Sequence, residues 1–241
     1  MELQQTTTFN IQVALFFSTP QNKLEKHTFS INETFENKFD MPPTVLPVPG
    51  DDQLQEVPVV TLRSSDGTTL TLARARVDLT VAGQGVQELK DVMPGVKREI
   101  EKLCEYLLRN SIGIKRIGFV VRHFVRTDKP ATDIGSLLGK KITDFHNNDF
   151  VDAAIRLINR TKLFGFETNN WSSFEIFSAN IAGQGDGLIG MLITRDFNTV
   201  PEQDYSDKIN NESISSFLDA GEKKQELSKI LTMLYGDKSK K

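Results

Sequence analysis

The sequence predicts an α+β protein in which a mainly antiparallel, curved sheet packs on two long amphipathic helices. Segments that alternate like β-strands follow one another with only short turns between them, whereas a parallel sheet needs a crossover between successive strands. Residues 93–110 and 211–236 carry apolar residues at the three- and four-residue spacing of a helix. Strands precede each helix, which suggests a duplicated unit of three strands and one helix.

This order divides the chain into two α+β halves, residues 1–112 and 113–241, although the same elements also fit a single integrated domain. An apolar strand is expected at residues 9–17, followed by a weak extended segment at 24–31. Residues 41–58 hold five of the nine prolines and are expected to form an extended surface loop, because proline fixes φ and has no backbone donor.

A hairpin is predicted next, because Asp66 and Gly67 suit a tight turn between two segments rich in β-formers. The apolar residues of the second segment change parity, which predicts a bulge near Ala73 and puts Arg74 and Arg76 on one face of a single strand. The helix that follows has Pro94 in its expected first turn.

The second half repeats the pattern of strands followed by a helix. Gly221 weakens the middle of the last helix by about 1 kcal/mol relative to alanine, which would allow a break there. The remaining elements are a strand at 114–125, a short helix within 131–142, and strands at 151–163, 171–181 and 187–197.

Composition excludes several classes of protein. A hydrophobic content of 38% and a charged content of 25% are those of an ordinary globular chain. No apolar run approaches the roughly 20 residues needed to span a bilayer, and no secretory signal is present, so a cytoplasmic protein with no membrane partner is predicted. Cys104 is the only cysteine and lies on the apolar stripe of the first long helix, which indicates a buried, inert thiol.

Few motifs in the sequence indicate a catalytic, metal-binding or phosphate-binding site. The tetrapeptide Ala-Gly-Gln-Gly occurs at residues 82–85 and 182–185, but neither copy continues into a phosphate-binding loop, so both are interpreted as turns. Asp144, His146 and Asp149 could bind a metal or act as an acid–base group, although such residues are also typical of a surface turn. We therefore predict no catalytic residue, no metal and no cofactor, with an unmarked hydrolase as an alternative.

The charge distribution is more informative. Residues 70–165 contain 17 basic and 11 acidic residues, a net charge of +6 in a chain whose total is −3. Arginines that share parity along a strand project from one face of a sheet, where guanidinium groups could bind phosphate or an acidic protein surface. The alternative is a solvated face whose arginines pair with the protein's own acids. The candidate residues are Arg74, Arg76, Arg116, Arg122, Arg126, Arg156 and Arg160.

The hairpin at 59–81, the helix with its exit into Arg116-Ile117-Gly118, and the final strand and helix resemble a sporadically distributed bacterial family of similar length. That family has no established activity. Its patchy distribution implies an accessory protein of a mobile element or a phage-defence system.

These observations together predict a non-enzymatic protein that binds a macromolecular partner through a sheet face or the proline-rich loop. A protein partner is the first expectation. Binding of nucleic acid or a nucleotide through the arginine-bearing strands is the alternative, since the sequence pI of 5.7 is low for a nucleic-acid-binding domain. Assembly into a homo-oligomer is left open.

Overall fold

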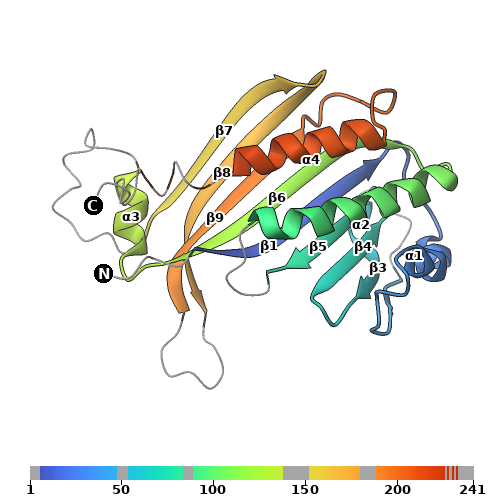
Figure 1. Cartoon of the computed structure of the whole chain (residues 1–241), viewed down its shortest axis with the longest axis horizontal. Coiled ribbons are helices and arrows are strands. Elements are labelled where there is room, and N and C mark those ends of the chain that lie inside the picture. Colours follow the sequence, from blue (N-terminus) through green and yellow to red (C-terminus); the bar gives the residue numbers. More distant parts are fainter. Residues whose placement is uncertain are drawn as a thin grey trace.

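The computed structural model describes residues 6–47, 54–83, 89–137, 152–179 and 188–225, together with Leu227, Ile230 and Thr232. Over these residues the chain forms strands, α-helices and one short 3-10 helix, η1 (Figure 1). The first part contains β1 (Thr6–Phe17), η1 (Leu24–His27), α1 (Thr28–Thr34), β2 (Thr44–Val45), β3 (Pro58–Arg63), β4 (Thr68–Ala73), β5 (Arg76–Ala82) and α2 (Leu89–Arg109). The second part contains β6 (Ile114–Arg126), α3 (Pro130–Ser136), β7 (Ala154–Leu163), β8 (Phe166–Ala179), β9 (Leu188–Thr199) and α4 (Asn211–Gln225).

The described strands form one nine-stranded sheet in the order β2-β3-β4-β5-β1-β6-β9-β8-β7. Each neighbouring pair is antiparallel, which confirms the predicted α+β class with an antiparallel sheet. The first strand, β1, lies between β5 and β6, so strands from both parts of the chain share this sheet.

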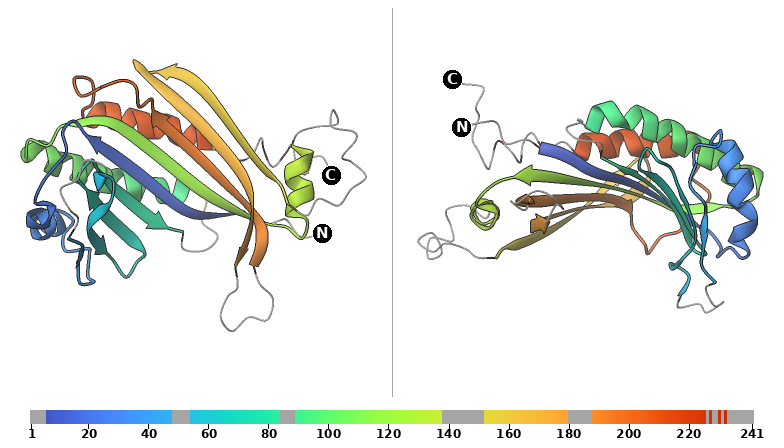
Figure 2. Two further views of the ribbon diagram at one scale, coloured as in Figure 1. Left: turned by 180° about the vertical axis from the view of Figure 1, so that it is seen from behind. Right: turned by 90° about the horizontal axis from the view of Figure 1, so that it is seen from below.

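Helices α2 and α4 lie side by side across one face of the sheet, which we call the helix face (Figure 1; Figure 2, right). Alternate residues of the central strands point toward these helices and are fully or almost fully buried. From β1 and β6 they are Ile11, Val13, Leu15, Ile117, Phe119 and Val121. The apolar stripe of α2 meets them with Met93, Val96, Ile100, Leu103 and Leu107, so the core lies between the sheet and the two helices.

The start of α2 differs from the prediction. The helix begins at Leu89, so Pro94 lies beyond the first turn and inside the helix. Proline at this position removes the backbone bond to the carbonyl of Lys90. The buried stripe on one side of α2 supplies the packing that holds the helix through this position.

The last helix does not break at its central glycine, because α4 runs unbroken through Gly221. Gly221 is buried against the sheet, and a Cβ added there would lie 2.5 Å from Cδ1 of Phe119 and 3.2 Å from Cδ1 of Phe197. The glycine therefore allows the helix to approach the sheet closely. The part of the predicted helix beyond Gln225 lies largely outside the described residues.

Two expectations for the first part of the chain need correction. Residues 68–82 are not one bulged strand but two antiparallel strands, β4 and β5, with Leu72 opposite Val77. A reversal of the chain changes the parity of the apolar residues just as a bulge does. Neither Arg74 nor Ala75 is a typical turn residue, so the sequence does not distinguish a turn from a bulge here. Residues 24–34, expected to be extended at their start, form η1 and α1.

A buried hydrogen-bonded group joins η1 and α1 to α2. The Tyr106 hydroxyl lies 2.7 Å from Nδ1 of His27 and 2.8 Å from the Ser30 hydroxyl. Burial is the main cause that lowers the pKa of His27 and raises that of Tyr106. These contacts satisfy polar groups inside the helix layer and hold α1 against α2.

A second, smaller apolar cluster lies on the same helix face near α3. It contains Ile134 of α3 together with Val125, Met191, Ile193 and Phe174 of three neighbouring strands. No helix among the described residues is both long and apolar enough to cross a membrane.

Candidate functional site

The face of the sheet opposite α2 and α4, which we call the open face, is the candidate functional site (Figure 2, left). The buried apolar side chains of α2 and α4 join the cluster on the helix face. Register and the alternation of side chains define the opposite set. It comprises Arg76 and Asp78 of β5, Asn10, Gln12, Ala14 and Phe16 of β1, Arg116, Val120, Arg122, Phe124 and Arg126 of β6, Thr194, Asp196 and Asn198 of β9, Glu167, Asn169, Trp171, Glu175 and Phe177 of β8, and Arg156, Ile158, Arg160 and Lys162 of β7.

Six of the seven predicted arginines lie on the open face. They are contributed by three strands, β5, β6 and β7, which other strands separate in the sheet. Arg74 is the exception, because it lies in the turn between β4 and β5 and does not share a strand face with Arg76. The six are Arg76, Arg116, Arg122, Arg126, Arg156 and Arg160.

Near the start of β6, two arginines flank one aromatic ring. Phe16 lies directly opposite Arg76 on one side and Arg116 on the other. The guanidinium carbons lie 5.6 Å and 4.5 Å from the ring centroid, within the range of cation–π attraction. Arg116 also donates to the backbone carbonyl of Thr199 at 3.3 Å. Burial is the main cause that lowers its pKa, so this guanidinium is partly withdrawn from water.

Carboxylates are interleaved with these cations. Asp78 accepts hydrogen bonds at 3.0 Å from Gln12 and from Arg76, and Arg76 also pairs with Glu56 at 3.1 Å. Burial raises the pKa of Asp78, and the cation of Arg76 opposes that rise. The open face therefore presents both signs of charge over short distances.

A second carboxylate, that of the half-buried Asp196, lies on β9. Burial raises the pKa of Asp196, while the amide of Asn198 at 2.9 Å and the cations of Arg122 and Arg116 act in the opposite direction. Arg122 donates to Oδ1 of Asn10 at 3.1 Å. These groups form a polar centre on the face, where each charged group is held by neighbours.

The arginines farther out are more exposed. Arg156 lies 3.6 Å from Glu175, and Arg160 lies 3.0 Å from Glu202. Arg126 is exposed, and within the described residues it forms no ion pair. Exposed ion pairs contribute little to stability, so these guanidinium groups can rearrange toward a partner at small cost.

Aromatic rings gather at one end of the open face. The ring of Phe177 lies 5.8 Å from that of Phe9 and 5.7 Å from that of Phe124. Phe124 covers Gly190, where an added Cβ would lie 2.5 Å from Cζ of this ring. Because Phe9 is exposed, the group offers an apolar contact surface beside the arginines.

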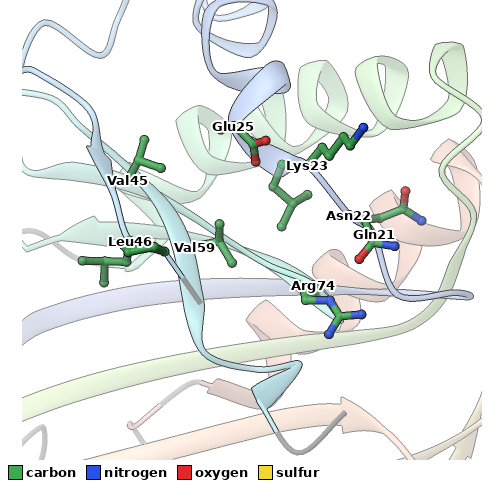
Figure 3. A pocket seen from close by; sticks show the side chains of 10 residues that line it. Gln21, Asn22, Lys23, Glu25, Val45, Leu46, Val59 and Arg74 are labelled. Atoms are coloured by element: carbon green, nitrogen blue, oxygen red, sulfur yellow. The ribbon is translucent and has the colours of Figure 1, made fainter. Parts of the chain in front are cut away.

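Arg74 lines a separate cavity of about 360 Å³ between η1, the β2 segment and the turn after β4 (Figure 3). Its lining is mixed: Lys23 and Glu25 carry charge, whereas Val45, Leu46 and Val59 are apolar. Leu24, Gln21, Asn22 and Pro47 also line the cavity. Among the described residues of this lining, no nucleophile is paired with a base.

The residues predicted as candidates for acid–base or metal chemistry, Asp144, His146 and Asp149, lie outside the described residues. So do Gln84, Gly85 and the whole of residues 182–185, which belong to the two Ala-Gly-Gln-Gly segments. Cys104 is buried, as predicted, and burial raises its pKa to about 12, which keeps the thiol protonated. Within the described ranges, no group of three His, Cys, Asp or Glu side chains could hold a metal ion.

Sequence reasoning missed the residues that complete the open face around the arginines. Phe16, Asp196 and Trp171 were not predicted as site residues, because the parity argument concerned only arginines. Phe16 could have been found from parity, since it alternates with the buried Leu15 in β1. Asp196 and Trp171 required the pairing of β8 with β9, which the sequence does not specify.

The geometry defines the chain as a two-layer α+β protein with one broad polar sheet face. No family model matches the chain, and a search of the curated proteins finds no relative.

Proposed function

We propose that this protein is a non-enzymatic binding protein whose open face recognises an acidic surface on a partner protein. The observation that carries the proposal is the contrast within one sheet: one face is covered by α2 and α4, while the other gathers six arginines and several aromatic rings. Arginine and aromatic side chains are the residues most enriched at the centres of protein interfaces.

The interleaved carboxylates favour a protein partner over nucleic acid. Asp78, Asp196 and Glu175 lie on the same face as the arginines. A phosphate backbone carries only negative charge and would be repelled by these groups, whereas a protein surface can match both signs locally. The mixture of ion pairs and aromatic rings is therefore better suited to a protein surface with an acidic centre.

A direct test compares partner recovery by four forms of the tagged protein: the wild type, two open-face variants and a control. We expect specific partners of the wild type to be lost from the double variant Arg122→Ala/Arg126→Glu and from Trp171→Ala, because both alter the open face. The matched control is Arg98→Glu/Arg109→Glu, which changes two arginines of α2 on the other side of the sheet. Quantitative mass spectrometry of the recovered proteins gives the readout.

The same proteins are then titrated with a fluorescently labelled DNA duplex and its single strand at several salt concentrations. Salt-sensitive binding by the wild type that the open-face variant loses would replace the protein partner with nucleic acid. Partners retained equally by all variants would contradict the open face as the binding surface.

A further inference from the structure

The outermost strand of the sheet, β7, has an unusual edge. At the opposite end of the sheet the edge strand β2 spans two residues, whereas β7 spans ten. β7 pairs with β8 along its whole length, and no other strand within the described residues pairs with it (Figure 1). A long edge strand presents unpaired backbone N–H and C=O groups that can accept another strand.

Apolar side chains along this edge are exposed. Leu157 is 58% exposed and Ile158 is 71% exposed, although they point to opposite faces of the sheet. Leu157 continues the row of Ile155 on the helix face. A strand added to β7 would cover both residues and so remove apolar surface from water.

The open-face side of β7 carries cations. Arg156, Arg160 and Lys162 alternate along the strand, with exposed side-chain fractions of 69%, 60% and 83%. Their carboxylate partners are Glu175, Glu202 and Glu167, at 3.6 Å, 3.0 Å and 3.6 Å. Because these ion pairs are exposed and weak, each cation can also bind a carboxylate of a strand that is added on the outer side of β7.

We propose that β7 binds an extended segment of a partner protein as a tenth strand, and that this segment alternates acidic and apolar residues. Backbone hydrogen bonds along the edge would supply affinity, as in other cases of strand addition. The acidic residues would face Arg156, Arg160 and Lys162, and the apolar residues would pack beside Ile155 and Leu157. This site is separate from the centre of the open face, so either proposal can fail without the other.

Charge argues against a second copy of this chain as the occupant. Antiparallel pairing of two β7 edges about a two-fold axis keeps both open faces on the same side. Arg156, Arg160 and Lys162 would then face the same three cations, and like charges on opposing strands are destabilising. An acidic strand would instead be attracted by these three cations.

The test uses a blocked octapeptide that alternates glutamate and valine, titrated against the whole protein by isothermal calorimetry. We expect binding, with new protection against hydrogen exchange for the β7 amides that face away from β8. Two further peptides carry N-methyl groups on every second amide, one on the glutamate amides and the other on the valine amides. Successive amides of a strand point to opposite edges, so only one of these sets faces β7. One methylated peptide should therefore lose binding, and the other should retain it.

Charge is tested with two double variants whose folding is checked by thermal unfolding. Arg156→Glu/Arg160→Glu should weaken peptide binding by about tenfold or more, whereas Arg122→Ala/Arg126→Glu should change it by less than about twofold. Loss of a natural partner by the second variant with intact peptide binding would separate this proposal from the open-face proposal.

Four results would overturn the inference. Two come from the peptides: equal binding of a peptide that carries its glutamates and valines in two separate runs, and equal effects of the two methylation patterns. The others are outward-facing β7 amides that are already protected in the free protein, and dimerisation through β7 in sedimentation experiments. The peptide comparisons use wild-type protein, so they decide the question even if the charge variants fold poorly.

Discussion

The two faces of the sheet are built from the same strands but have different roles. On β6, Phe119 points to the helix face and is fully buried, while its neighbour Val120 points to the open face and is half-buried. The helix face holds the apolar contacts that stabilise the fold, and the open face holds Arg116, Arg122 and Asp196. Alternation along a strand therefore separates the packed core from the polar open face at the level of adjacent residues.

The strongest way to test this comparison is to truncate neighbouring residues. We expect Phe119→Ala to lower the free energy of unfolding by about 3–5 kcal/mol, because it opens a cavity beneath α4. Val120→Ala should cost about 1 kcal/mol or less, since its site is not enclosed by a helix. Urea unfolding of both variants measures the difference. Similar losses would contradict the division of roles.

A second prediction concerns a buried histidine on the helix face. Burial, together with the cation of Arg195, lowers the pKa of His123 to about 4 from its usual value of 6.5. The unfolded chain therefore binds more protons between these values, so stability falls as the pH falls through that window. The full loss is about 3 kcal/mol. His123→Leu should lose less stability than the wild type between pH 7 and pH 4.5, and equal losses would show that His123 is not the cause.

Glycines on the two helices provide a matched third test. Gly221→Ala should destabilise the protein by about 1–3 kcal/mol, because the added Cβ would meet Phe119 and Phe197. Gly95→Ala should stabilise it by about 0.5–1 kcal/mol, because Gly95 of α2 has no neighbour within 4 Å of that position. Thermal unfolding gives both values. The same sign for both would show that α4 does not depend on its close approach to the sheet.

The smallest effect is expected at the outer strand of the open face. Arg156→Ala should change the free energy of unfolding by about 0.5 kcal/mol or less, because its pair with Glu175 is exposed and 3.6 Å long. Chemical denaturation checks this value. A loss of several kcal/mol would mean that Arg156 has a structural role, which would weaken the case for binding.

Local patterns predicted most of the strands, α2 and the first part of the last helix, α4. The stripe from Met93 to Leu107 identified α2, and alternation identified β1, β6 and β7. The division into halves at residue 112 and the repetition of a three-strand unit remain predictions. The turn at Arg74 was missed because a bulge and a reversal produce the same change of parity.

The open face was only partly predictable for a related reason. Parity places Arg116, Arg122 and Arg126 on one face of β6 without any knowledge of the fold. That Arg156 and Arg160 project to the same side depends on β9 and β8 lying between β6 and β7, and this order is set by long-range packing. The same order brings Asp196 beside the arginines.

The central place of β1 has a consequence for synthesis of the chain. This strand is made before both of its neighbours, because β5 is complete only at residue 82 and β6 only at residue 126. Until β5 is made, Ile11, Val13 and Leu15 have no neighbouring strand to pair with, and α2, which ends at Arg109, covers them later still. The nascent chain therefore carries an unpaired apolar strand while the residues up to β5 are made, a period in which premature self-association competes with folding.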